Sequence, residues 1–404
     1  MGTWVNHNLG DLIVLHDSKR VPLSSREREK RRGVYPYYGA TSVMDYVDDY
    51  LFDGDFILLG EDGTVVTEKG KPVLQQIHGK SWVNNHAHVI TADNQIDFHF
   101  LYYLLMDTDV RAIVTGAVQP KISQANLKTV MVSVPDLQTQ RKIAAVLSAL
   151  DDKIENNRRI CKTLEEMAQA IFKSWFVDFE PFCGTVVEND VWGRHPEDLP
   201  YVQVRDIDSI LETGSRPKGG ASASGVPSIG AENVKELGVV DFNAAKFIPV
   251  DYAAKMKRGR INGYELLLYK DGGKPGTFTP HFSMFGEGFP YKECFINEHV
   301  FKLDLGSPSA NVFAYFYFQT PNVFHWLATN GSKAAIPGIN QANVLEIQMP
   351  DPANVHVKRF GELVLPSFRL IFEKCKESRA LASMRDALLP KLMSGEIDVE
   401  GVAV

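Results

Sequence analysis

The sequence predicts an α+β fold: two mixed α/β domains of duplicated architecture, joined by two long antiparallel helices that form a coiled coil. Three observations predict it. Short segments recur in the same order in the two halves of the 404-residue chain. Each half opens with short β-branched and aromatic runs interrupted by Gly, Pro, Asn and Asp, as strands and turns require. Each half then ends in a long segment with helical periodicity.

Five matched segments carry the duplication. In chain order they pair PYYGA (36–40) with PSIGA (227–231), YLFDGDFILLGEDG (50–63) with RINGYELLLYKDG (260–272), SWVNNHAHVI (81–90) with CFINEHVFKL (294–303), FLYYLL (100–105) with FAYFYF (313–318), and KISQANLKTV (121–130) with GINQANVLEI (338–347). The offset between the copies grows from 191 to 217 residues, as insertions in the second copy would make it. Five matches in one order predict that one folding unit is used twice.

The first long helix is predicted over residues 137–176, which contain no proline. Steps of four and three residues connect the members of a heptad seam: Ile143, Leu147, Leu150, Ile154, Asn157, Cys161, Leu164, Ala168, Ile171 and Trp175. Such a seam is typical of a coiled coil, and a lone polar member such as Asn157 often fixes the register. About 40 residues at 1.5 Å each make a helix of roughly 60 Å.

The second long helix follows at the repeat offset of 217 residues. Its seam is weaker and more polar: Phe360, Val364, Ser367, Ile371, Lys374, Ser378, Leu381, Arg385, Leu388 and Leu392. Pro366 is expected to interrupt or kink this helix, because proline lacks the backbone donor. The simplest arrangement packs the two helices against each other, antiparallel, with one domain attached to each copy.

Composition excludes several classes. No apolar run approaches the length that spans a bilayer, and the N-terminus does not resemble a secretory signal. The four cysteines form no C-x-x-C pair, which fits a reducing cytoplasm and argues against zinc and disulfides. The net charge of −7 speaks mildly against nucleic acid, but basic residues are concentrated at 19–32 and 255–260. Such basic patches can bind phosphate even on a chain whose net charge is negative. The alternative is that both patches are solvated loops without a function.

The sequence contains few catalytic patterns, and none of them recurs in both copies. Among the neighbouring histidines of the first copy, only His86 has a counterpart, His299, so no metal site is predicted. Pro135-Asp136 with Asp151 and Lys153 resembles the scattered carboxylates of metal-dependent nucleases, but the second copy has no matching set. No nucleotide-binding glycine fingerprint and no nucleophile elbow is present. A nuclease therefore remains only a minor alternative, and the chain is predicted not to be an enzyme.

Two domains with basic and aromatic loops, held apart by a rigid pair of helices, suit a ligand with two features at a fixed separation. Duplex DNA with two half-sites is such a ligand. A scaffold that binds only proteins is the alternative.

Three segments resemble a known family. They are SQANLKTVMVSVPDLQTQRKIAAVLSALDDKIENNRRICKTLEEMAQAIFKSWFVDFEPF (123–182), TGSRPKGG with GVPSIGAENV (213–234), and LLPKLMSGEIDVEGV (388–402). In order, they are similar to the central region, the opening of a target recognition domain and the C-terminal end of specificity subunits of Type I restriction–modification systems.

The resemblance implies a non-catalytic, cytoplasmic DNA-specificity subunit that reads an asymmetric, bipartite target in double-stranded DNA. It implies target recognition domains at 1–135 and 181–350, a central conserved helix at 136–180, and a distal conserved helix with the C-terminal tail at 351–404. The expected partners are two modification (methyltransferase) subunits and the restriction subunits, with no membrane. The chain would hold no cofactor or metal, because S-adenosylmethionine, ATP and Mg²⁺ would belong to those partners.

Side-chain chemistry and loop position indicate candidate DNA contacts. Lys and Arg can bind phosphate or guanine, and Gln can read adenine. The candidates are Arg28, Lys30, Arg31, Arg32, Tyr37, Gln119 and Lys121 in the first domain, and Arg216, Lys218, Lys257, Arg258, Lys274 and Lys333 in the second. A plain surface charge remains the alternative for each.

The repeated ISQANL and INQANV segments are predicted to be structural. Ser123 and Asn340 are suitable N-cap residues for a short helical turn that precedes each long helix.

Overall fold

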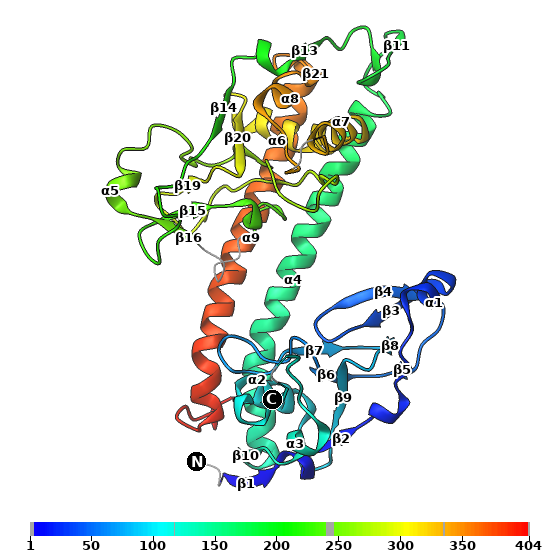
Figure 1. The fold of residues 1–404 in the computed structure, drawn as a ribbon, viewed down its shortest axis with the longest axis vertical. Helices are drawn as coiled ribbons and strands as arrows, with labels where there is room; N and C mark the ends of the chain where they lie inside the picture. Colours follow the sequence, from blue (N-terminus) through cyan, green and yellow to red (C-terminus); the bar gives the residue numbers. More distant parts are fainter. Residues whose placement is uncertain (1–3, 117, 240–245, 334–335, 403–404) are drawn as a thin grey trace. The chain divides into compact units, whose positions relative to one another are not determined.

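The computed structural model describes residues 4–116, 118–239, 246–333 and 336–402 (Figure 1). The chain divides into two compact units: unit 1 comprises Met1–Lys153 and Leu381–Val404, and unit 2 comprises Ile154–Ala380. The long helices α4 (Leu137–Phe176) and α9 (Val355–Met393) each contribute one part to unit 1 and one part to unit 2.

Unit 1 contains two four-stranded sheets and a separate strand pair. The first sheet has the order β2-β9-β6-β7, and the second has the order β4-β3-β8-β5 with β3 parallel to β8. The strand pair consists of β1 (Val5–Asn8) and β10 (Met131–Val134). The strands of the two sheets are β2 (Ile13–Leu15), β3 (Arg32–Tyr38), β4 (Val43–Val47), β5 (Phe52–Asp53), β6 (Phe56–Gly60), β7 (Leu74–Ile77), β8 (Lys80–Val83) and β9 (Ala87–Ala92).

Three shorter helices complete unit 1: α1 (Ser25–Lys30), α2 (Phe98–Asp107) and α3 (Gln124–Lys128). The Asp97 side chain caps α2 by accepting hydrogen bonds from the N–H groups of His99 and Phe100. The apolar face of α2 lies in the same core as Ile143 and Leu147 of α4. Single 3-10 turns lie at Leu9–Asp11, Asp17–Lys19 and Arg111–Ile113.

Unit 2 has the same plan with additions. Its sheets have the orders β14-β20-β17-β18 and β16-β15-β19, with β15 parallel to β19. The strands of these sheets are β14 (Ile210–Thr213), β15 (Val226–Ile229), β16 (Lys246–Ile248), β17 (Leu266–Tyr269), β18 (Phe282–Ser283), β19 (Phe295–Ile296) and β20 (Val300–Asp304). In addition, β13 (Tyr201–Gln203) pairs with β21 (Gln348–Pro350), and β11 (Val186–Asn189) and β12 (Gly193–Pro196) form a hairpin.

The helices of unit 2 are α5 (Val250–Ala253), α6 (Pro308–Tyr317), α7 (Pro321–Gly331) and α8 (Gln341–Leu345), with 3-10 turns at Val204–Asp206 and Ala231–Asn233. The predicted caps are confirmed, because Ser123 accepts from the N–H of Asn126 at the start of α3 and Asn340 accepts from the N–H of Asn343 at the start of α8.

The predicted duplication is confirmed at the level of single hydrogen bonds. The N–H of Glu61 donates to the carbonyl of His86 at 2.8 Å, and the N–H of Lys270 donates to the carbonyl of His299 at 3.0 Å. These pairs follow equivalent registers of β6 with β9 and of β17 with β20. Glu61 therefore corresponds to Lys270, and His86 corresponds to His299.

The parts of α4 and α9 within each unit pack against each other in an antiparallel manner. In unit 2, Phe172 contacts Phe360, and Asn157 donates from Nδ2 to Glu377 at 3.1 Å. In unit 1, the Arg385 guanidinium lies 2.6 Å from Asp151. Residue numbers therefore fall along α9 as they rise along α4. The buried Asn157 bonds across the seam, as a register-fixing residue would.

Most of the predicted seam is observed. Fully buried members are Ile143, Leu147, Ile154, Asn157, Ala168, Phe360, Val364, Ile371 and Leu392, and partly buried members are Leu150, Cys161, Leu164, Ile171, Trp175, Leu381 and Leu388. In α9 the seam is displaced by one residue at two places, where Phe368 and Leu389 are buried instead of Ser367 and Leu388.

The expected interruption at Pro366 is wrong, because α9 continues through it from Val355 to Met393. Pro366 lies on the exposed face, as does Glu362, whose carbonyl loses its helical partner to the proline. That carbonyl can bond water, while the buried Val364 and Phe368 hold the helix in place on either side.

Candidate nucleic-acid interface

Several predicted contacts of unit 1 are engaged inside the protein. Arg28 bonds to Asp45 at 3.2 Å, and Arg31 bonds to Asp48 at 2.9 Å. Tyr37 is 1% exposed, and its hydroxyl accepts a hydrogen bond from the N–H of Leu23. The choice of Tyr37 as a DNA contact is therefore wrong, because its ring belongs to the core beneath β3.

The other four candidates of unit 1 lie on the surface. Lys30, at the end of α1, and Arg32, at the start of β3, are exposed. Gln119 and Lys121 belong to a loop closed by paired backbone hydrogen bonds between Thr115 and Lys121, at 2.7 and 2.8 Å. These four residues remain predicted contacts.

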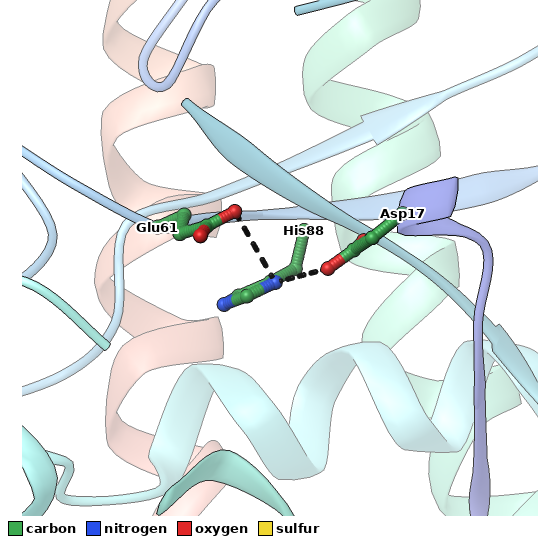
Figure 2. A group of neighbouring side chains, drawn as sticks. All are labelled: Asp17, Glu61 and His88. Carbon is green, nitrogen blue, oxygen red and sulfur yellow. Dashed lines mark hydrogen bonds and ion pairs between the residues drawn. The ribbon is translucent and has the colours of Figure 1, made fainter. Parts of the chain in front are cut away.

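Beneath this loop lies a buried cluster of Asp17, Glu61 and His88 (Figure 2). Asp17 opens a 3-10 turn, Glu61 follows β6, and His88 lies on β9. His88 Nδ1 is 2.6 Å from Asp17 Oδ2 and 3.7 Å from Glu61 Oε2, and His88 Nε2 is 2.8 Å from the carbonyl of Ile122. Both ring nitrogens are thus engaged.

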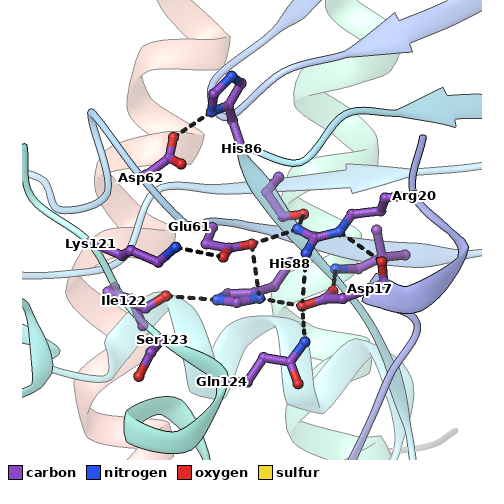
Figure 3. Close-up of polar contacts among 12 residues, drawn as sticks. Asp17, Arg20, Glu61, Asp62, His86, His88, Lys121, Ile122, Ser123 and Gln124 are labelled. Carbon is purple, nitrogen blue, oxygen red and sulfur yellow. Dashed lines mark hydrogen bonds and ion pairs between the residues drawn. The ribbon is translucent and has the colours of Figure 1, made fainter. Parts of the chain in front are cut away.

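Two cations and an amide bind the cluster's carboxylates (Figure 3). Arg20 donates from Nη1 to Glu61 at 2.6 Å, and Lys121 lies 3.1 Å from the same carboxylate. Gln124, in the repeated SQAN segment, donates to Asp17 at 2.6 Å. A divalent ion would have to displace Arg20 and Lys121, so the donor set fits an ion-pair network and not a metal site.

The network controls the ionisation of its acids. Burial alone would raise the pKa of Asp17, but hydrogen bonds from His88 and the N–H of Val89 hold that pKa below its ordinary value. Burial likewise opposes ionisation of Glu61, and Arg20 and Lys121 lower its pKa. The sequence analysis missed this network, and its only visible signal was the repeated Gln124.

The nuclease alternative is not supported by the geometry. Asp136 caps α4 by accepting from the N–H groups of Gln138 and Thr139, and those bonds lower its pKa. Asp151 is bound by Arg385 and by the Tyr103 hydroxyl. Fifteen residues of one helix separate the two carboxylates by roughly 22 Å, too far apart to share a metal with Lys153.

Unit 2 presents its predicted cations differently. Arg216 lies 3.4 Å from Glu298, and Lys333 donates to the side chain of Asn330. Lys218 and Lys274 are exposed on loops.

Lys257 and Arg258 line an open hollow of about 260 Å³ with Ser215, Tyr252, Lys255 and Met256. Tyr252 donates to Ser215 at 3.0 Å, which holds two hydroxyl groups at the hollow. Among the described residues, no carboxylate forms an ion pair with the three cations of the hollow, Lys255, Lys257 and Arg258. Concentrated, uncompensated positive charge in a polar hollow suits a phosphate group.

One exposed polar arrangement occurs in both units. His86 Nδ1 lies 2.5 Å from Asp62 Oδ1, and His299 Nδ1 likewise contacts Asp271. The imidazole side chains are 46% and 42% exposed. The sequence analysis matched the two histidines but did not identify their aspartate partners.

One equivalent backbone hydrogen bond anchors the neighbouring loop in each unit. The N–H of Gly63 donates to the carbonyl of Pro120, and the N–H of Gly272 donates to the carbonyl of Pro337, both at 2.9 Å. Each glycine has a positive φ, 82° and 131°, which a side chain would strain.

In the parts of the chain that the structure describes, no helix combines the length and apolar character needed to cross a membrane.

Comparison with known proteins finds similarity to one family. The model of the Type I restriction modification DNA specificity domain matches residues 1–166. A Haemophilus influenzae protein described as a type I restriction enzyme specificity subunit is 32% identical over 142 residues, 35% of this chain and 36% of that protein. The MjaIX specificity subunit of Methanocaldococcus jannaschii is 28% identical over 312 residues, 74% of this chain and 69% of that protein. The chain thus spans about a third of the first relative's length and over two thirds of the second's.

A solved structure has the same fold along the whole chain. The crystal structure of a Type-I restriction-modification system S subunit from M. genitalium covers 97% of this chain and 96% of its own, with a TM-score of 0.56 and 15% identity. These matches confirm that the chain resembles type I restriction–modification specificity subunits, as the sequence motifs predicted.

Proposed function

We propose that this chain recognises a bipartite, asymmetric target in double-stranded DNA, with one half-site read by each unit. The observation that carries the proposal is one fold present twice with different exposed side chains. Unit 2 presents the hollow of Lys255, Lys257 and Arg258, while in unit 1 Arg28 on α1 and Arg31, which follows α1, are paired with aspartates. Equal scaffolds with unequal surfaces are what two different half-sites require.

The chain would act without chemistry of its own. It would direct two modification subunits and the restriction subunits to the target, in the cytoplasm, and S-adenosylmethionine, ATP and Mg²⁺ would be bound by those partners. This role is supported by the relatives, which are named specificity subunits, and by the carboxylates of Asp136 and Asp151, which are engaged in structural bonds.

Changing one unit should change one half-site. When the loops at 214–224 and 255–260 of unit 2 are exchanged for those of a relative, we expect only one half of the methylated sequence to change. Methylome sequencing of a host that carries the chain and its modification subunit measures this outcome. The reciprocal control exchanges 118–121 of unit 1 and should change the other half. If both halves change together, the assignment of one half-site to each unit is wrong.

Loss of phosphate contacts should act equally on all sequences. For the double variant Lys218→Ala and Lys333→Ala, we expect weaker binding to target and random DNA. Each lost contact should flatten the slope of log K against log[salt] by about 0.9. Titrations of labelled duplexes at several salt concentrations measure this slope, and Lys162→Ala, an exposed change on α4, is the control. An unchanged slope in the double variant would contradict these two contacts.

Two alternatives have distinct outcomes. A scaffold that binds only proteins would assemble with modification subunits yet show no preference among DNA sequences. A nuclease would cleave DNA with Mg²⁺ in the absence of partners, and we expect no cleavage.

A further inference from the structure

The exposed pairs Asp62–His86 and Asp271–His299 occupy the same place in the two units. In each unit the backbone N–H of the histidine donates at 2.8 Å to the side-chain oxygen of an asparagine two residues earlier, Asn84 or Asn297. The aspartate lies in an Asp-Gly turn, and an isolated bridge joins it to the neighbouring loop, at Lys121 in unit 1 and at Gly338 in unit 2.

The groups beneath these pairs have diverged. The β-sheet registers place Phe301 at the position of the buried His88, and Lys270 at the position of Glu61. In unit 2 the Lys270 ammonium lies 5.4 Å from the Phe301 ring and donates to the carbonyl of Glu298. The buried network of unit 1 is therefore absent from the corresponding described positions of unit 2. The surface pair occurs in both units, and a shared core beneath it cannot be the reason.

The imidazoles are 46% and 42% exposed and their aspartates 18% and 26%, so each pair is partly open to water. Stability gives no strong reason to retain such pairs, since an ion pair open to solvent contributes about 0–1 kcal/mol. A third exposed pair illustrates this point. His78 Nδ1 lies 2.7 Å from Asp55, with the two side chains 62% and 63% exposed. The registers of β6 and β17 place Tyr264 at the position of Asp55, so this third pair occurs in unit 1 but not at the equivalent place in unit 2.

We propose that Asp62–His86 and Asp271–His299 are equivalent contacts to the DNA phosphate backbone, which orient each unit on its half-site. This inference rests on the proposed function. An identical contact made on two different half-sites must use what the half-sites share, and they share the sugar–phosphate backbone. The aspartate holds Nδ1, and the outward Nε2 donates to a phosphate oxygen when the ring is protonated.

The charges around each ring differ. In unit 1, Asp62 binds Nδ1 of His86, and the carboxylate of the adjoining Glu61 is paired with Lys121. Around His299, Asp271 binds Nδ1, and Glu298 lies 3.2 Å from Nε2 while it also pairs with Arg216. Phosphate must displace Glu298 from His299, so we expect the contact of unit 1 to be the stronger one.

The test uses matched substitutions in the full chain assembled with its modification subunit. His86→Asn and His299→Asn keep an amide near the aspartate but remove the outward nitrogen, and His86→Gln places an amide at the Nε2 position. His78→Asn is the control, because it alters an exposed pair that is not repeated. Binding is measured at about pH 6 and about pH 8 on target and random duplexes at several salt concentrations.

We expect His86→Asn to weaken binding several-fold on both duplexes and to flatten the salt slope by up to about one. The methylated motif should stay unchanged, His299→Asn should have a smaller effect, and His86→Gln should recover part of the affinity. Unchanged affinity in both Asn variants, or a motif altered at one half-site, would overturn the inference. If the wild-type complex itself shows no preference for its target over random DNA, the proposed function fails instead.

Discussion

Replacing Arg20 with methionine is expected to lower the free energy of unfolding of unit 1 by about 3–5 kcal/mol near neutral pH. Arg20 bonds to Glu61 at 2.6 Å, lies 3.4 Å from Asp17, and donates to the carbonyl of Ala87. The side chains of Asp17 and Glu61 are nearly buried. Removal of the cation therefore leaves Glu61 without its nearest counter-charge and Asp17 without one of its ion-pair partners, and methionine preserves only the length of the side chain.

The cost should depend on pH with a definite sign. The pKa values of Asp17 and Glu61 are held below their ordinary values of 3.8 and 4.5 in the folded state. A lowered carboxyl pKa contributes stability that is present above the ordinary pKa and is lost as pH falls through the folded value. The native chain should therefore lose stability in unit 1 as the pH falls below about 4, and the cost of Arg20→Met should shrink in the same range.

Hydrogen exchange followed by mass spectrometry can measure this effect separately in the peptides of each unit. Arg111→Met is the matched control, because Arg111 is an exposed arginine of unit 1 that pairs with Asp109. We expect the control to leave protection unchanged. Equal protection of β6 and β9 in Arg20→Met and in the native chain would show that the network does not stabilise unit 1.

The sequence predicted the features that depend on periodic or repeated patterns. The order of the repeats predicted a folding unit that is used twice, and the heptad spacing predicted α4, because such patterns report which face of an element is buried. Ser123 and Asn340 were recognised as caps because capping depends on residues three apart in sequence.

Contacts between distant segments could not be predicted in this way. Arg20, Glu61 and His88 meet because β2, β6 and β9 share a sheet, and no local pattern states that strand order. Tyr37 was predicted from its aromatic chemistry, but packing against other strands places it in the core, between the half-buried Pro36 and Tyr38. Pro366 was judged by backbone propensity alone, whereas packing of the neighbouring residues determines whether the helix continues.

The second large effect concerns the spacer, which is the stretch of base pairs between the two proposed half-sites that neither unit reads. One heptad is inserted into α4 between Lys153 and Ile154, and another into α9 between Ala380 and Leu381. These positions lie between the Asp151–Arg385 and Asn157–Glu377 bonds, so both cross-helix contacts are preserved. Seven residues make nearly two full turns, which keeps the seam in phase and adds about 10 Å to each helix.

At about 3.4 Å per base pair, that length corresponds to at most about three base pairs of DNA. We expect methylome sequencing to show both half-sites unchanged and the spacer longer by up to that number. A heptad inserted into α4 alone is the control, and it should weaken the helix pair because the two seams no longer match in length. If the paired insertion altered the half-sites and left the spacer unchanged, the helices would not set the spacing. The two units would then read DNA through contacts that do not depend on helix length.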